Sequence, residues 1–370
     1  MKYIDEFRDP ALARRLIAQI RATAAHLDSA RPIRLMEFCG GHTHAISRFG
    51  LRELLAPDIE LRSGPGCPVC VTSAADLDLA IAMADVPGVI LATFGDMVRV
   101  PGSHRQTLQA AAARGADVRI VYSPLDALDI ARQYPQREVV FLGVGFETTA
   151  PGIAAALLQA QTDGVPNFSV LSLHKLTPPA TRAILDAGEV ALDGIIGPGH
   201  VSAIIGSDAW GFLPRDYHIP CAVSGFEPLD ILSAIGALVQ AVVADEPAVI
   251  NTYARGVRPE GNLIAQQLLT QVFEVGPADW RGFGMIPDSG LVLRETFAHR
   301  DAARQTAGRF PVDVTPAKEL PGCRCGDVLR GVIAPTECVL FRQVCSPRNP
   351  IGPCMVSAEG ACAAYFQYET

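Results

Sequence analysis

The chain has 370 residues, of which 49% are hydrophobic and 19% charged, with a formal net charge of −8. This composition supplies a sizeable apolar core and excludes a disordered chain. The acidic balance, without any block of Lys or Arg, argues against a nucleic-acid partner. The longest nearly apolar stretch, residues 231–244, is shorter than the roughly 20 residues of a membrane span, and the start lacks the apolar core of a signal peptide. We therefore expect a cytoplasmic protein without a membrane anchor.

Short apolar runs alternate with Ala- and Leu-rich segments over residues 1–250. The runs predict strands buried on both faces, and the segments between them predict helices. The predicted strands are 33–39, 59–62, 88–94, 118–122, 139–144, 168–173, 194–196 and 221–224. The predicted helices include 76–84, 106–114, 124–134, 152–162, 178–187 and 228–244. This alternation predicts an α/β fold with parallel sheets covered by helices.

The eight predicted strands divide into two groups of four, with a boundary near residue 125. We therefore expect two similar small α/β domains, residues 1–124 and 125–227, with the helix 228–244 able to pack back on the first. Residues 245–370, which contain six of the ten cysteines, form a third domain. A (β/α)8 barrel is the rival arrangement, and counting strands does not exclude it.

The first motif that carries chemistry is Cys-Gly-Gly-His-Thr-His at residues 39–44, directly after a predicted strand. The thiolate of Cys39 and the imidazoles of His42 and His44 can bind a soft or borderline metal ion. The two glycines let the backbone turn so that these side chains converge, and open α/β sheets bind ligands where strands end. The alternative is a buried free cysteine beside a helix-capping Thr43.

The second motif is the Cys-x-x-Cys pair Cys67 and Cys70, which follows a Gly-Pro-Gly turn at residues 64–66. Two such thiols form a reversible dithiol or transient iron ligands, and a helix N-terminus makes the first thiol more acidic. With a helix expected to begin near Thr72 or Ser73, we expect at least one acidic, solvent-accessible thiol. Structural zinc is the alternative, but it usually requires a second such pair, which the chain lacks.

The third motif is a set of C-terminal cysteines separated by 14, 6 and 16 residues, spacings that fit no zinc ribbon or finger. Its members are Cys323, Cys338, Cys345 and Cys362. Four thiolates from separated loops can hold a [4Fe–4S] cluster, with structural zinc as the alternative. Cys325 and Cys354 are left over, and they can form a second dithiol nearby.

Two further turns at strand ends carry groups suited to hydrogen bonding or proton transfer. Glu147, Thr148 and Thr149 follow one strand, and His200 and Ser202 follow another. Glu147 can act as an acid–base group or orient a neighbour, and His200 can relay protons. The alternatives are a helix N-cap for the threonines and a structural role for the histidine.

Taken together and in their order along the chain, these five motifs resemble the HypD family of hydrogenase maturation factors. The resemblance implies two α/β domains of similar build and a third domain that holds a [4Fe–4S] cluster. It further implies a complex with a small HypC-type chaperone, visited by a HypE-type cyanide donor. On that complex an Fe(CN)₂CO unit is assembled for [NiFe] hydrogenase.

The resemblance also implies roles for individual residues. Cys39 would bind the iron together with a cysteine of the small chaperone, and Cys67 and Cys70 would form a redox dithiol near it. A likeness to ferredoxin–thioredoxin reductase would make Cys325 and Cys354 a dithiol beside the cluster. The cluster ligands would be Cys323, Cys338, Cys345 and Cys362. The further candidate catalytic residues are His42, His44, Glu147, Thr148, Thr149, His200 and Ser202.

Three functions remain open at this point. The first is a redox-active assembly scaffold, rather than a conventional turnover enzyme. The second is a stand-alone thiol/disulfide reductase of the ferredoxin–thioredoxin reductase type, and the third is a non-catalytic binding protein whose C-terminal cysteines hold zinc. Releasing cyanide from a thiocyanate needs two electrons, which a cluster passes singly and a dithiol stores as a pair. The presence of both thiol motifs therefore favours the scaffold.

Overall fold

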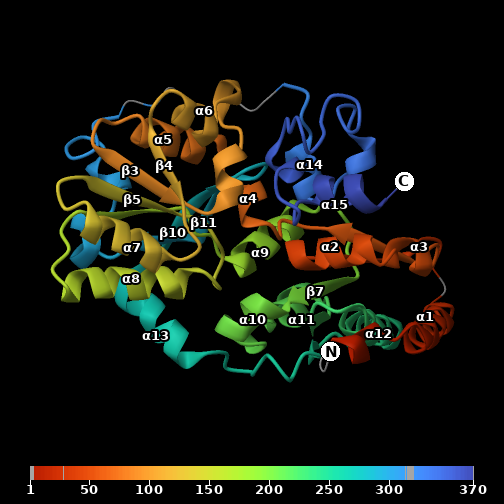
Figure 1. Cartoon of the computed structure of the whole chain (residues 1–370). Helices are drawn as coiled ribbons and strands as arrows, with labels where there is room; N and C mark the ends of the chain where they lie inside the picture. Colours follow the sequence, from red (N-terminus) through yellow and green to blue (C-terminus); the bar gives the residue numbers. More distant parts are fainter. Residues whose placement is uncertain (1–3, 28, 313, 315–320, 370) are drawn as a thin grey trace.

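The computed structural model describes residues 4–27, 29–312, 314 and 321–369. This part of the chain forms two parallel sheets covered by helices, with a C-terminal module that is rich in loops (Figure 1). The predicted α/β class is therefore confirmed. Among the described residues, no helix combines the length and the apolar composition needed to cross a membrane.

The first sheet has five parallel strands in the order β2-β1-β7-β8-β9. They are β1 (Ile33–Glu37), β2 (Ile59–Ser63), β7 (Gly194–Pro198), β8 (Cys221–Ser224) and β9 (Val249–Asn251). Helices α1 (Pro10–Ala24) and α12 (Pro228–Ala244) pack against each other beside this sheet (Figure 1). α1 begins where it does because the Asp9 carboxylate accepts hydrogen bonds from two N–H groups of its first turn, and Pro10 needs no such acceptor.

The second sheet has four parallel strands in the order β4-β3-β5-β6. They are β3 (Val89–Thr93), β4 (Asp117–Ile120), β5 (Glu138–Gly143) and β6 (Phe168–Ser172). The helices associated with it are α5 (Ala74–Ala84), α6 (Leu108–Ala113), α7 (Pro124–Gln133) and α8 (Ala150–Thr162). α7 starts with a cap in which Ser123 Oγ accepts from the N–H of Leu125 (3.1 Å) and the Asp126 carboxylate accepts from the N–H of Ser123 (3.0 Å).

All eight predicted strands are present, but the division of these strands at residue 125 is wrong. β1 and β2 pair within one sheet with β7 and β8, and Leu35 of β1 lies opposite Gly194 of β7. A Cβ at Gly194 would lie 2.8 Å from the end of the Leu35 side chain, so glycine leaves room for that leucine. Helical crossovers allow a parallel strand to pair far from its neighbours in the sequence. The two separate sheets also exclude the rival barrel.

An antiparallel hairpin, which the sequence did not predict, follows α13 (Leu263–Val272). Its strands are β10 (Phe273–Trp280) and β11 (Gly284–Leu293). β10 contains Pro277, which argues against a regular strand, and the register shifts between Gly276 and Ala278 to accommodate it. The base of the hairpin packs into the core of the second sheet through Val272, Phe273, Leu291 and Leu293.

The C-terminal module contains two short helices, α14 (Cys325–Leu329) and α15 (Ala361–Tyr368), with a small apolar core of its own. α15 packs on α2 (Gly40–Arg48), which links the module to the first sheet. The other α-helices are α3 (Leu51–Leu55), α4 (Pro68–Val71), α9 (Thr177–Ala187), α10 (Gly199–Ile205) and α11 (Phe212–Tyr217). The 3₁₀ turns are Asp5–Arg8, Gly95–Arg99, Ser103–Arg105, Asp208–Trp210, Glu295–Arg300, Ala303–Gln305, Pro335–Glu337 and Pro353–Met355.

Candidate functional site

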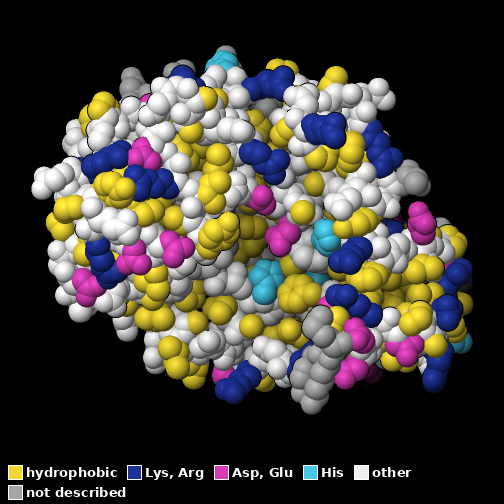
Figure 2. Space-filling model, viewed as in Figure 1, with side chains coloured by type: hydrophobic (Ala, Val, Ile, Leu, Met, Phe, Trp, Pro, Cys, Tyr) yellow, Lys and Arg dark blue, Asp and Glu magenta, His cyan; other side chains and the backbone are white. Residues whose placement is uncertain are grey.

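Four turns meet at the carboxyl end of the first sheet, after β2, β1, β7 and β8. The turns after β1 and β2 lie in direct backbone contact, because the N–H of Gly40 donates to Gly66 O (2.8 Å). A Cβ at Gly66 would overlap the backbone of Cys39, so only glycine allows this approach. Figure 2 shows a hollow in the middle of one face of the molecule, where hydrophobic side chains lie beside histidines and acidic residues. The expectation that strand ends would bring these motifs together holds for this sheet.

Cys39 lies at the N-cap position of α2 and is only 2% exposed. Its Sγ is 3.5 Å from Nδ1 of His200, which comes from the turn after β7. Burial raises the pKa of the Cys39 thiol well above its ordinary value. A metal ion that binds this sulfur therefore has to displace a proton, and the His200 imidazole is in contact with that sulfur.

His42 and His200 both pack against the ring of Phe226, with centroid distances of 5.1 and 5.5 Å. Nε2 of His42 donates to the carbonyl of Gly225 (2.8 Å), whereas its buried Nδ1 has no hydrogen-bond partner among the described residues. Burial lowers the pKa of each histidine to about 4. Both imidazoles are therefore neutral at pH 7, the state in which histidine binds metals.

His44 points away from Cys39 and toward the end of the chain. Its Nδ1 lies 3.3 Å from Ala358 O, and its Nε2 lies 3.3 Å from the hydroxyl of Tyr368. The structure therefore places His44 in the contact between α2 and α15, and it does not bring the two histidines of the motif together at the thiol.

Glu37 is a buried carboxylate that the sequence reasoning missed, because it lies inside a predicted strand. It accepts a hydrogen bond from the N–H of Cys39 (2.8 Å) and another from the hydroxyl of Thr43. Burial raises the pKa of Glu37 to about 7, although the hydrogen bonds from Thr43 and Cys39 act to lower it. Thr43 thus binds Glu37 and does not cap α2. A charged residue at the end of an apolar run, two positions before the cysteine, was the available signal.

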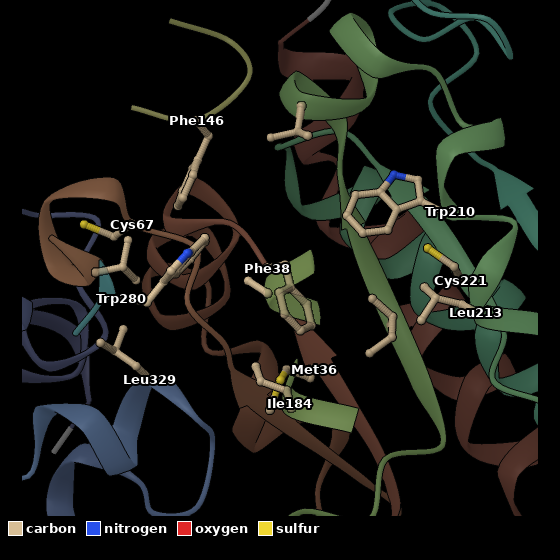
Figure 3. Packing of buried hydrophobic residues seen from close by; sticks show 14 of the residues in the cluster. Met36, Phe38, Cys67, Phe146, Ile184, Trp210, Leu213, Cys221, Trp280 and Leu329 are labelled. Carbon is tan, nitrogen blue, oxygen red and sulfur yellow. The ribbon is translucent and has the colours of Figure 1, made fainter. Parts of the chain in front are cut away.

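Cys67 is the N-cap residue of α4, a single helical turn that begins at Pro68. Cys70 lies within that turn. The two cysteines are 3% and 0% exposed, and burial raises the pKa of Cys70 well above its ordinary value. The expectation of at least one solvent-accessible thiol is therefore wrong, because both cysteines lie in a buried cluster with Trp280 and Leu329, and Figure 3 shows Trp280 beside Cys67. Cys70 Sγ instead faces the C-terminal module, 3.9 Å from Pro353 O.

The four predicted cluster cysteines line one small cavity in the C-terminal module, together with apolar side chains that include Phe341 and Met355. Four thiols around one apolar cavity are a donor set that fits an iron–sulfur cluster or zinc. In the described part of the chain, no three Cys, His, Asp or Glu side chains are already placed at metal-binding positions. A disulfide joins Cys325 to Cys354 at the edge of the same cavity, with Cα atoms 6.4 Å apart.

Three of the four remaining candidate residues form hydrogen bonds to other residues of the fold. The Glu147 oxygens accept from the N–H (2.7 Å) and hydroxyl (2.9 Å) of Thr177, at the start of α9. Ser202 accepts from the indole N–H of Trp210 (2.9 Å), and Thr149 donates to Phe146 O (3.2 Å). These three residues bind neighbouring elements of the fold. Thr148 is partly exposed beside them.

Comparison with known proteins assigns the family. The family model HypD, described as the hydrogenase formation hypA family, matches residues 11–369. The chain belongs to the HypD family. Its relatives include the hydrogenase maturation factors HypD of Azotobacter vinelandii (50% identity), Cupriavidus necator (48%) and Escherichia coli K12 (46%). Each alignment covers 100% of this chain and 97%, 97% and 98% of the relative, respectively.

The buried Glu147 of this HypD-family chain should make stability depend on pH. Burial raises the pKa of its folded-state carboxyl to about 7 from 4.5. Between those values the folded chain keeps a proton that the unfolded chain has lost, so stability falls as pH rises through this window. We expect Glu147→Gln to remove a loss of up to about 3 kcal/mol between pH 4.5 and 8. Denaturant unfolding of both proteins at several pH values measures it.

The exposed Glu274 provides the control. Glu274→Gln should show the wild-type pH dependence. If Glu147→Gln loses stability with pH as steeply as the wild type, Glu147 does not contribute to the pH dependence, and Glu37, whose pKa is also raised to about 7, is left as a source of it.

Proposed function

We propose that this chain is the scaffold on which the Fe(CN)₂CO unit of [NiFe] hydrogenase is assembled. The observation that carries the proposal is the position of Cys39, a buried thiol in backbone contact with the turn that leads to Cys67 and Cys70. A soft thiolate suits iron with cyanide and CO ligands, and the buried setting keeps water away from that iron. The printed names of the relatives, hydrogenase maturation factors, support the same class of function.

In this proposal iron is the substrate, and Cys39 supplies one ligand to it. Loss of the thiol proton on binding is assisted by His200 Nδ1, 3.5 Å from the sulfur. Glu37 fixes the thiol by holding the N–H of Cys39. His42 and His200 both pack on the ring of Phe226, which adds an apolar group to the site. A second thiolate from a HypC-type small chaperone and cyanide from a HypE-type donor would complete the unit in the cytoplasm.

The C-terminal cysteines are proposed to supply the electrons. Cys323, Cys338, Cys345 and Cys362 would hold a [4Fe–4S] cluster, which delivers single electrons when it is bound. The Cys325–Cys354 disulfide borders the same cavity, and Cys70 Sγ contacts the carbonyl of the residue before Cys354. The two thiol pairs are therefore close neighbours, and a dithiol can store the electron pair that cyanide release requires.

Infrared spectroscopy tests this function on protein purified anaerobically with its small partner. We expect absorption bands of iron-bound cyanide and CO, with iron and acid-labile sulfide in metal analysis. Disulfide reductase activity without these bands would favour the stand-alone reductase. Zinc in place of iron would favour the non-catalytic binding protein.

A further inference from the structure

The tip of the β10–β11 hairpin, residues Trp280 to Phe283, contacts the backbone beside both thiol pairs. Trp280 and Arg281 are 1% and 3% exposed, although they lie at a hairpin turn. The indole of Trp280 stacks on Phe146 (6.0 Å) and donates to Ser289 Oγ (2.8 Å). The buried Lys175 donates to the carbonyl of Asp279 (2.8 Å). The tip is thus held from the second sheet and is a fixed part of the fold.

On one side the tip binds the backbone that follows Cys70. The N–H of Arg281 donates to Val71 O (2.9 Å), and its Nε donates to Thr72 O (2.9 Å). Thr72 also forms an antiparallel bridge with Trp280. Val71 and Thr72 are the two residues directly after Cys70, so these bonds set the position of the dithiol turn.

On the other side the tip meets the backbone that follows Cys325. Gly282 and Gly326 approach so closely that a Cβ on Gly326 would lie 2.8 Å from Gly282 Cα. Arg330, the residue directly after α14, donates to Gly282 O (2.5 Å). Gly326 is the neighbour of Cys325, so the same tip also sets the position of the disulfide.

We infer that this hairpin tip is the element that positions the Cys67/Cys70 dithiol relative to the Cys325–Cys354 disulfide, with Arg281 as a positioning residue. The inference rests on the proposed electron transfer between the two pairs. In that exchange the Cys325/Cys354 pair is reduced and the Cys67/Cys70 pair is oxidised, and a Cys354 thiolate attacks the sulfur of Cys70 while Cys67 leaves as a thiolate. Cys325 then attacks Cys354 and releases Cys70. One disulfide is formed and one is broken, while two electrons and two protons pass from the C-terminal pair to the Cys67/Cys70 pair.

The test follows this exchange in the full chain. Protein with both pairs reduced receives one molar equivalent of diamide, which oxidises one dithiol. Alkylation at successive times and mass spectrometry then give the fraction of disulfide at each pair. Arg281→Lys should slow the redistribution about 10–100-fold, because small displacements of reacting atoms have effects of this size. Gly326→Ala should slow it similarly without removing a hydrogen bond, because its methyl group pushes against Gly282.

Arg300→Lys is the matched control. Arg300 is also buried and donates to backbone carbonyls, those of Val165 (2.8 Å) and Phe168 (3.0 Å), in the second sheet. It should lower the thermal midpoint as Arg281→Lys does, yet redistribute the disulfide at the wild-type rate. Wild-type rates in both Arg281→Lys and Gly326→Ala would overturn the positioning role while leaving the exchange intact. Absence of redistribution in the wild type would overturn the exchange and this inference with it.

Discussion

Replacing Cys39 by alanine is expected to abolish the infrared bands of iron-bound cyanide and CO and to stop hydrogenase maturation. Cys39 is the buried thiol at the meeting of the strand-end turns, and alanine offers no ligand atom in its place. The change removes one sulfur atom, so folding should be little affected. The iron and sulfide content of the C-terminal module should stay at the wild-type level, because its cysteines line a different cavity.

Cys221→Ala is the matched control for this variant. Cys221 is also a buried free thiol of the first sheet, but it lies within β8. It should keep the infrared bands at wild-type intensity. Persistence of the bands in Cys39→Ala would show that another group binds the iron.

Alanine at Cys338 or Cys345 should remove the brown colour of the protein and most of its iron and sulfide. Each change deletes one thiol from the cavity that the four cysteines line. The module has two short helices and a small core of its own, so metal binding should supply much of its folding free energy. We therefore expect faster proteolysis within residues 321–369 as well.

Cys325→Ala tests the assignment within the same module, because Cys325 lies in the disulfide and not in the predicted ligand set. It should retain the cluster. Unchanged iron and sulfide in the Cys338 and Cys345 variants would contradict the ligand assignment. Loss of the cluster in Cys325→Ala would move that residue into the ligand set.

The sequence predicted the strands well, because a strand covered on both faces must be apolar along its whole length. It could not predict which strands pair, because nothing in the sequence pattern around Leu35 or Gly194 indicates that β1 and β7 lie side by side. The hairpin was missed because Pro277 sits within β10, where only the bulge makes it acceptable.

The candidate site was predictable where chemistry and position coincide. Cys39 and His200 follow strands of the same sheet, and the rule that ligands bind at strand ends identified both. The same rule pointed to Glu147, and of its two suggested roles the orienting of a neighbour agrees with the hydrogen bonds of its carboxylate to Thr177 at the start of α9. The rule about strand ends could not identify Arg281. This buried arginine lies at a hairpin tip and binds backbone carbonyls whose positions depend on the whole fold.

The division of the first sheet between distant parts of the chain also determines when the proposed iron site can form during synthesis. The second sheet uses residues 89–172 and can form while the chain is still being made. β1 must wait for β7, and at typical elongation rates its inner edge stays unpaired for roughly 10–30 s. The nascent chain therefore carries an exposed strand edge that ribosome-bound chaperones can shield. Cys39 reaches its final surroundings only after β8 and the last helix have emerged, so a half-made chain has no assembled site to capture iron.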